Sequence, residues 1–72
     1  MTNQEIGEKV RLRRRKLHLR QRDLAELAGV TLRGLTELEN GRANPTINHL
    51  AKIAEVLGLE LRLLEKSAHA SS

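Results

Sequence analysis

The segment from residue 21 to residue 41, QRDLAELAGVTLRGLTELENG, places the tightest constraint on how this 72-residue chain can fold. Apolar residues recur at intervals of three and four on both sides of Gly29 (Leu24, Leu27 and Ala28 before it, Leu35 and Leu38 after it). Glycine tolerates the left-handed backbone found at helix ends, so the first helix should stop at Gly29. Thr31 is a good N-cap for the second helix, and Gly41 is its expected stop. The segment therefore predicts two short helices joined by a tight turn.

Helical spacing continues on either side of this segment. Residues 3–17 carry one apolar stripe, with acidic residues near the start and arginines later, a polarity that suits the helix dipole. After the only proline, Pro45, Thr46 is placed to cap a further helix that ends at Gly58. The expected apolar stripe of that helix consists of Ile47, Leu50, Ile53, Ala54 and Leu57. The expected fold class is an all-α bundle of four short helices with brief connections.

The apolar period changes after Gly58. Every second residue is then a leucine (Leu59, Leu61 and Leu63), which is the two-residue period of a strand. A single strand has no ladder partner in a helical chain, so we expect it to pair with the same strand of a second subunit in a homodimer. The alternative is a fifth short helix packed on the core. Residues 1–66 are thus predicted as one domain, with residues 59–65 for dimerisation and residues 67–72 as a disordered tail.

Composition narrows the classes of function. Without Phe, Tyr or Trp, the chain lacks the stacking platforms by which single-stranded nucleic acid is usually held. Without Cys, it has no disulfide, thiolate metal site or cysteine nucleophile, and no catalytic or metal-binding motif is present. We therefore expect no enzyme activity, no cofactor and no metal. The chain also shows no signal peptide and no apolar run of membrane-spanning length, so a soluble cytoplasmic protein is expected.

The net charge of +4 is unevenly distributed along the chain. Eight basic residues and no acidic residue lie between positions 9 and 22 (Lys9, Arg11, Arg13, Arg14, Arg15, Lys16, Arg20 and Arg22). Such a block favours a polyanion, of which the nucleic-acid backbone is the commonest. The alternative interpretation is an ordinary solvated helix face.

The turn at Gly29 bears on how the chain would bind a nucleic acid. Two helices joined by a short glycine-containing turn cross at a steep angle, so the second protrudes far enough to enter a DNA major groove. Ala25 is small where the two helices approach, and Val30 with Leu35 fills the angle between them. The alternative is an ordinary αα-hairpin inside a bundle. Together with the basic block, the spacing favours binding of double-stranded DNA by the helix that follows Thr31.

Three stretches, LRQRDLAELAGV, LTELENGRANPT and LAKIAEVLG, resemble the Cro and phage-repressor type of helix-turn-helix family in residues and relative spacing. The resemblance covers residues 6–58. It implies a lambda-repressor-like bundle of four or five helices, in which the helix after Thr31 reads base edges. It also implies that two copies bind a palindromic operator on double-stranded DNA. The expected function is therefore sequence-specific repression of transcription by a dimer associated with the nucleoid.

The resemblance further implies which residues face DNA. Those at base-contacting positions are Leu32, Arg33, Thr36 and Glu37, and those at phosphate-contacting positions are Arg20, Gln21, Thr31, Asn40 and Arg42. The resemblance also implies that Gln21 braces the helix that follows Thr31. Chemically, Arg33 suits guanine O6 and N7, Leu32 suits a thymine methyl group, and Glu37 suits the amino group of cytosine.

Three features of the sequence bear on this assignment of DNA-contacting residues. Arg14 and Glu39 match a family pair that ties the first helix to the end of the third, and they are interpreted as scaffold. Arg20 stands where the family has Ser or Thr, so the cap of the second helix is weaker and a phosphate could take its place. Leu32 and Glu37 stand where the family has amides, which argues against its typical readout of adenine.

The C-terminal stretch LGLELRLLEK resembles the HipB-type antitoxins, in which a short strand pairs across the dimer. This resemblance implies an alternative function, an antitoxin that represses its own operon and also binds a HipA-like toxin with a kinase fold. A third class, an RNA-binding or coactivator module built on the same fold, also stays open.

Overall fold

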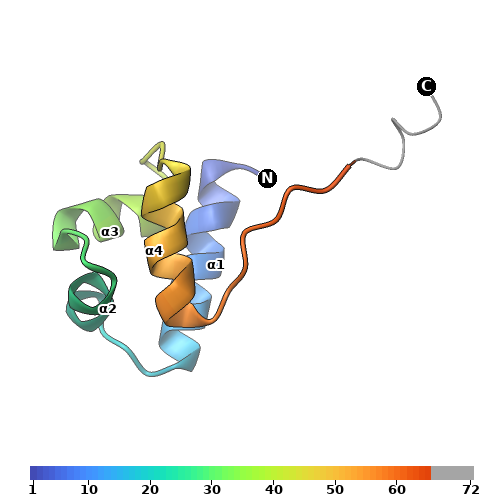
Figure 1. The fold of residues 1–72 in the computed structure, drawn as a ribbon. Helices are drawn as coiled ribbons and strands as arrows, with labels where there is room; N and C mark the ends of the chain where they lie inside the picture. The colour runs from blue at the N-terminus through green and yellow to red at the C-terminus, as the bar shows by residue number, and fades with distance from the viewer. Residues whose placement is uncertain (66–72) are drawn as a thin grey trace.

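The computed structural model describes residues 1–65, which form four helices. Helix α1 spans Asn3–Lys16, α2 spans Gln21–Ala28, α3 spans Leu32–Glu39 and α4 spans Ile47–Leu57. Helices α3 and α4 each pack against both α1 and α2 (Figure 1). The predicted all-α fold is confirmed, with four helices in the described part of the chain. None of the helices in residues 1–65 is long and apolar enough to cross a membrane.

Short polar contacts fix where the helices begin and end. Three threonine hydroxyl groups accept a hydrogen bond from a backbone N–H in the first turn: Thr2 from Glu5 at 3.1 Å, Thr31 from Gly34 at 3.0 Å and Thr46 from His49 at 3.1 Å. At the other ends of α2 and α4, Gly29 and Gly58 adopt φ angles of 69° and 70°. These are left-handed angles that a residue with a Cβ adopts only at a cost. The caps predicted at Thr31 and Thr46 and the stops at Gly29 and Gly58 are confirmed.

A small apolar core lies where the four helices meet. Its largest fully buried side chains are Leu24, Leu35, Leu38, Ile53 and Leu57. Ala25 is buried beside them, and Val30 packs against the core from the turn, as the sequence predicts. The turn between α2 and α3 is therefore packed from inside, which holds the angle between the two helices.

One leucine and one isoleucine predicted for the apolar stripes, Leu27 and Ile47, are exposed instead. Leu27 is 64% exposed, because α2 is buried through Leu24, Ala25 and Ala28, and position 27 lies roughly a quarter-turn or more from the middle of that face. Ile47 is 72% exposed at the first position of α4, one turn before the helix meets the core at Leu50. Both predictions were wrong because a helix of two or three turns supplies too few residues for the period to define one face.

Helices α1 and α3 approach each other unusually closely at Gly7. This glycine is buried, and a Cβ added to it would overlap the backbone carbonyl oxygen of Leu38. The absence of a side chain at Gly7 therefore sets how near α3 can lie to α1.

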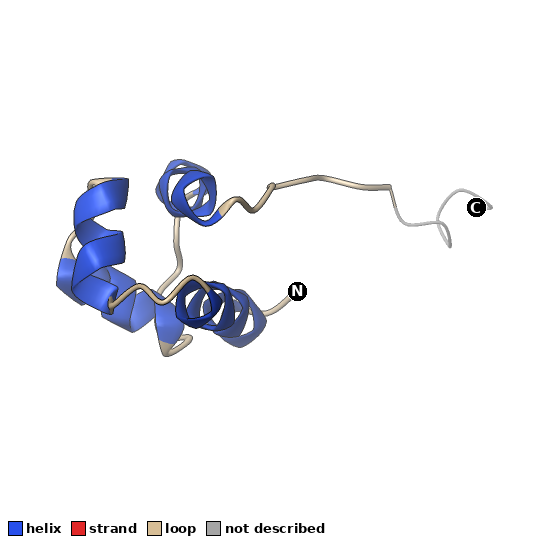
Figure 2. Ribbon diagram, turned by 90° about the horizontal axis from the view of Figure 1, so that it is seen from below, coloured by secondary structure: helices blue, strands red, loops and turns tan. Residues whose placement is uncertain are grey.

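Beyond α4 the chain leaves the bundle as a single extended segment, residues 59–65 (Figure 2). The segment is not helical, so the alternative of a fifth helix is wrong. Residues 1–65 contain no β-strand, since a ladder needs a second strand and the bundle supplies none. Pairing of this segment with a second subunit stays a prediction. The tail predicted at residues 67–72 lies outside the described residues.

Replacing Gly7 with alanine tests the close approach. In a solvent-exposed helix the change would stabilise by about 1 kcal/mol through helix propensity. At Gly7 we expect a loss of about 1–3 kcal/mol instead, because the new methyl group must push α1 away from the Leu38 carbonyl. Urea unfolding followed by circular dichroism measures the change, with Glu8→Ala on the exposed side of α1 as control. A Gly7→Ala variant as stable as the unaltered chain would contradict the packing described.

Candidate nucleic-acid interface

One side of α3 is not covered by the bundle and forms a shallow hollow of about 500 Å³. The hollow is lined by Leu32, Arg33, Thr36, Glu37, Asn40 and Arg42. These are all four residues predicted to contact bases and two of the five predicted to contact phosphates. Leu32 is 42% exposed here, so an apolar side chain faces solvent at the start of α3. The structure thus brings six of the nine predicted residues together on one surface.

The other three predicted phosphate contacts lie at helix N-termini. Arg20 is the N-cap residue of α2, Gln21 is the first residue of that helix, and Thr31 is the N-cap residue of α3. They do not line the hollow. Helix N-termini carry unpaired N–H groups and a partial positive charge, so these positions remain chemically suited to an anion.

Arg33 and Glu37 form an ion pair along the outer face of α3. Their Nε and Oε1 atoms are 3.7 Å apart, and the side chains are 91% and 43% exposed. A pair this exposed contributes little to stability because water screens it. A ligand that enters the hollow can therefore separate the two charged groups at small energetic cost and contact both.

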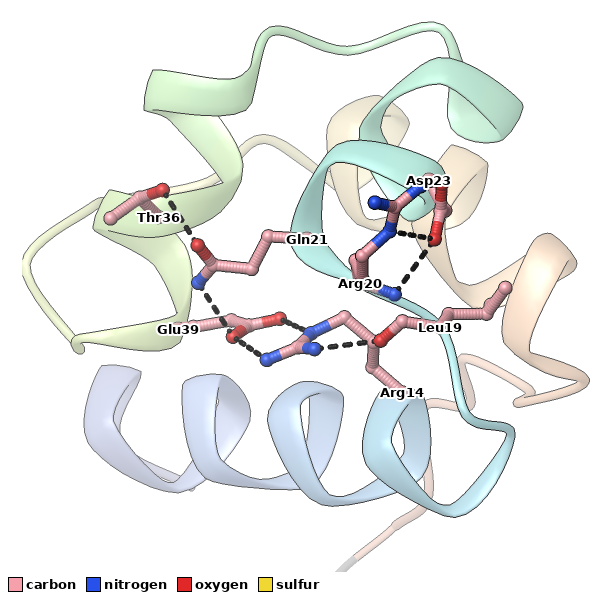
Figure 3. A network of polar contacts seen from close by, with 7 residues as sticks. All are labelled: Arg14, Leu19, Arg20, Gln21, Asp23, Thr36 and Glu39. Atoms are coloured by element: carbon pink, nitrogen blue, oxygen red, sulfur yellow. Dashed lines mark hydrogen bonds and ion pairs between the residues drawn. The ribbon is translucent and has the colours of Figure 1, made fainter.

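Behind the hollow, a buried ion pair joins the end of α1 to the end of α3 (Figure 3). Arg14 donates from Nε to Oε2 of Glu39 at 2.7 Å and from Nη2 to Oε1 at 3.0 Å. A further donor, Nη1, reaches the carbonyl oxygen of Leu19 at 2.8 Å. The hydrogen bonds to Glu39 raise the pKa of the Arg14 guanidinium above its usual value, although burial acts in the opposite direction. The scaffold role predicted for this pair agrees with its geometry.

Gln21 extends this network from Glu39 to Thr36, which lines the hollow. Its Nε2 donates to Oε1 of Glu39 at 3.0 Å, and its Oε1 accepts from the hydroxyl of Thr36 at 3.3 Å. Figure 3 shows the side chain of Gln21 between the two residues of α3. We refer to Arg14, Glu39, Gln21 and Thr36 as the polar network. It holds the last turn of α3 against α1 and α2.

Arg20 forms a local pair at the start of α2. Its Nε and Nη2 atoms donate to the carboxylate of Asp23 at 3.0 and 3.2 Å, and its backbone N–H donates to the same group at 3.0 Å. Hydrogen bonds from the side chain and then the backbone of Arg20 lower the pKa of Asp23 below its usual value. Asp23 therefore supplies a polar contact at this helix end, where Arg20 itself cannot act as an accepting cap.

The basic block is not a single face. Arg14 is buried in the polar network, and Arg13 donates from Nε to the carbonyl oxygen of Leu57 at 2.8 Å, at the C-terminal end of α4. Arg11 is half-buried, and its Nε has no hydrogen-bond partner among the described residues. The remaining basic side chains of the block are exposed: Lys9, Arg15, Lys16, Arg20 and Arg22. At least two of the eight basic residues thus serve the fold rather than a polyanion.

The resemblance implies that Gln21 braces α3, and the hydrogen bonds of Gln21 to Thr36 and Glu39 agree with that role, although the two partners were not predicted. Sequence reasoning missed the bond between Arg13 and Leu57, which joins residues 44 positions apart. The only available signal was the position of Arg13 near a helix C-terminus, where a cation is favourable. That signal says nothing about which other helix end the guanidinium reaches.

The sequence of the chain is similar to those of known proteins. A family described as helix-turn-helix matches residues 10–64. The chain is 36% identical over 63 residues to y4mF, an HTH-type transcriptional regulator of Sinorhizobium fredii, which covers 88% of this chain and 83% of the relative. It is 29% identical over 65 residues to the ImmF control region 10 kDa protein of Bacillus phage phi105, which covers 90% of this chain and 72% of the relative.

A solved structure agrees in fold as well as in sequence. The crystal structure of the clp gene regulator ClgR from Corynebacterium glutamicum is similar to this chain with a TM-score of 0.77 and 30% sequence identity. The similarity covers 82% of this chain and 63% of the ClgR chain.

Removing Arg14 tests the buried ion pair. Arg14→Leu leaves the carboxylate of Glu39 buried without its counter-charge, and we expect a loss of about 3 kcal/mol or more. That is most of the stability that a single small core supplies, so the variant should lose helical circular dichroism on mild heating. The double variant Arg14→Leu with Glu39→Leu should recover much of the loss, because no unpaired charge remains.

An exposed pair provides the control for this experiment. Arg20→Ala breaks the ion pair with Asp23. The Arg20 side chain is 79% exposed, so the substitution should change the unfolding midpoint little. Equal destabilisation by Arg14→Leu and Arg20→Ala would contradict a special role for the buried pair.

Proposed function

The chain belongs to the Cro and phage-repressor type of helix-turn-helix family, and from that premise we propose that it is a dimeric repressor that reads an operator in the major groove with α3. The single observation that carries this proposal is the hollow on α3, which collects the four predicted base-contacting residues with Asn40 and Arg42. A protruding helix of this kind fits the major groove, whose base edges present donors, acceptors and methyl groups. Such a regulator acts in the cytoplasm at the nucleoid.

The chemistry of the hollow supports direct readout of sequence. Arg33 has the forked donors that match guanine O6 and N7, and Glu37 accepts from the amino group of cytosine. Leu32, exposed at the start of α3, offers an apolar contact for a thymine methyl group. The surface thus contains a donor, an acceptor and an apolar group within two turns of helix.

Phosphate contacts on either side of the groove would fix the position of α3. Asn40 and Arg42 follow α3 directly, and Arg20 and Thr31 lie at helix N-termini. Gln21 uses one of the two protons of its Nε2 for Glu39, so the second proton suits a phosphate oxygen. We assign these five residues to the DNA backbone, where they position the protein without reading sequence.

Dimerisation is proposed to involve residues 59–65. Their first residues lie along an apolar groove of about 440 Å³ between α1 and α4, which is also lined by Met1, Ile6, Val10 and Leu50. Leu61 and Leu63 in this segment are 49% and 97% exposed. An extended segment with exposed leucines at alternate positions is suited to pair with its own copy, which would bury both the side chains and the unpaired backbone groups.

The antitoxin alternative stays a prediction from the sequence. It rests on the resemblance of residues 57–66, and nothing observed in residues 1–65 identifies a protein toxin as partner. The repressor function does not depend on it.

Two arginine variants separate base readout from backbone binding. Arg33→Ala should weaken binding to the selected operator by about 1–3 kcal/mol and relax selection at one base pair, since it removes a base-edge contact. Arg42→Ala should weaken binding to operator and random DNA alike. It should also reduce the slope of the logarithm of the binding constant against the logarithm of the salt concentration by about one unit. Site selection followed by titrations at several salt concentrations measures both effects. If Arg33→Ala weakens operator and random DNA equally, Arg33 does not read a base.

A charge placed among the alternating leucines tests the dimer. Leu61→Lys should shift the chain from dimer to monomer in sedimentation equilibrium, because a lysine cannot be buried between two paired segments without a counter-charge. Leu64→Lys makes the same substitution on the opposite side of the predicted strand, where Leu64 is 78% exposed, and should leave the dimer intact. A Leu61→Lys variant that sediments as the unaltered dimer does would rule out this interface.

A further inference from the structure

The hydrogen bonds of the polar network have a fixed direction that ends at Thr36. Arg14 has only donors, so both oxygens of Glu39 serve as acceptors, at 2.7 and 3.0 Å. A carboxylate paired in this way cannot donate, so Gln21 must present its amide NH₂ to Glu39, at 3.0 Å. The amide oxygen of Gln21 then faces Thr36 (Figure 3). The group that satisfies this oxygen is the hydroxyl proton of Thr36, across 3.3 Å.

From this direction we infer that Thr36 acts on DNA only as a hydrogen-bond acceptor and therefore selects an exocyclic amino group, N6 of adenine or N4 of cytosine. A hydroxyl has a single proton, and in this structure the proton is used inside the protein. The lone pairs of Oγ1 remain for a ligand in the hollow, which Thr36 lines. Adenine and cytosine carry the amino donors of the major groove, whereas guanine and thymine present oxygen or N7 acceptors there. The inference deepens the proposed function and rests on it.

Thr36 differs in this respect from its neighbours in the hollow. Arg33 can only donate and a charged Glu37 can only accept, so residue type alone decides which base groups they contact. A hydroxyl can do either, and its role depends on the partner that claims its proton. A buried arginine on α1, which does not line the hollow, thus decides through Glu39 and Gln21 what a side chain of α3 can recognise.

The expected size of the effect follows from the geometry. At 3.3 Å the bond from Thr36 to Gln21 is the longest of the network and hence its weakest member. A base acceptor would have to break this bond to reach the proton, whereas a base amino group leaves it intact. A net hydrogen bond of ordinary strength corresponds to a preference of roughly threefold to tenfold.

The test begins by locating the base pair that Thr36 contacts. Site selection with the full chain gives the preferred operator, and the same selection with Thr36→Val shows which base pair loses its preference. Valine keeps the shape and the methyl group of threonine but lacks the hydroxyl. Thr36→Ser keeps the hydroxyl and should retain the preference. Thermal unfolding of each variant verifies that it is folded at the binding temperature.

Base analogues at that pair then identify the functional group. Purine in place of adenine, or pyrimidin-2-one in place of cytosine, removes only the amino group. Removal of the amino group should weaken binding of the unaltered chain roughly threefold to tenfold more than it weakens binding of Thr36→Val. Comparing the two proteins on the same duplexes cancels any effect of the analogue on the duplex itself. Removal of the partner's carbonyl oxygen, with 2-aminopurine for guanine or 5-methylpyrimidin-2-one for thymine, should weaken both proteins equally.

Gln21→Met tests whether the network sets the direction. Methionine leaves the hydroxyl proton of Thr36 without its acceptor, so Thr36 can donate as well as accept. In the Gln21→Met background, the roughly threefold to tenfold effect of Thr36 on the loss of the amino group should therefore shrink toward its effect on the loss of the carbonyl oxygen. Coupling of Thr36 to a carbonyl oxygen in the unaltered chain, no base pair altered by Thr36→Val, or an amino preference that survives Gln21→Met would each overturn the inference. A chain that selects no duplex site at all would instead refute the proposed function.

Discussion

The ion pair between Arg14 and Glu39 is the interaction on which the placement of α3 depends. Glu39 is only 3% exposed, and its two carboxylate oxygens accept three hydrogen bonds, two from Arg14 and one from Gln21. A buried charge is tolerated only with such complete pairing, and each partner fixes its position relative to the others. Since α1 and α2 supply the donors and α3 supplies the carboxylate, these contacts fix the position of the C-terminal end of α3. Gly7 complements it by allowing the backbones of α1 and α3 to touch.

A polar network of this kind gives orientation more than stability. Helix α3 has only eight residues, of which Leu35 and Leu38 are its fully buried apolar side chains. Two leucines on a short helix resist its removal from the core but constrain its rotation weakly, because apolar contacts have no preferred direction. The hydrogen bonds that Glu39 accepts from Arg14 and Gln21, and the one that Thr36 donates to Gln21, have a direction, so they restrict rotation of the outward face. In the proposed complex with DNA, the outward face of α3 must match base edges closely, and that match needs this restriction.

The parts of this architecture that depend on neighbouring residues could be predicted from sequence, and those that depend on distant ones could not. The caps at Thr31 and Thr46 and the glycine stops follow from local backbone chemistry, so their positions were correct. Leu27 and Ile47 belong to the predicted apolar stripes but are exposed, because short helices leave the buried face poorly defined. The grouping of the predicted base-contacting residues was also anticipated, through the family resemblance. The resemblance also implies that Gln21 braces α3, but its choice of Thr36 as partner depends on side-chain directions across a helix crossing, which no spacing in the chain encodes.

The mixed charge of the hollow explains how a protein of net charge +4 would avoid indiscriminate binding in the proposed complex. Arg33 alone would bind any phosphate, but Glu37 lies 3.7 Å from it and repels the backbone. On a matching site the two groups separate onto guanine and cytosine, and both charges are satisfied by base edges. On a mismatched site Glu37 remains close to phosphate oxygens without a donor, which costs free energy. Specificity then arises as much from the penalty at wrong sites as from the contacts at the right one.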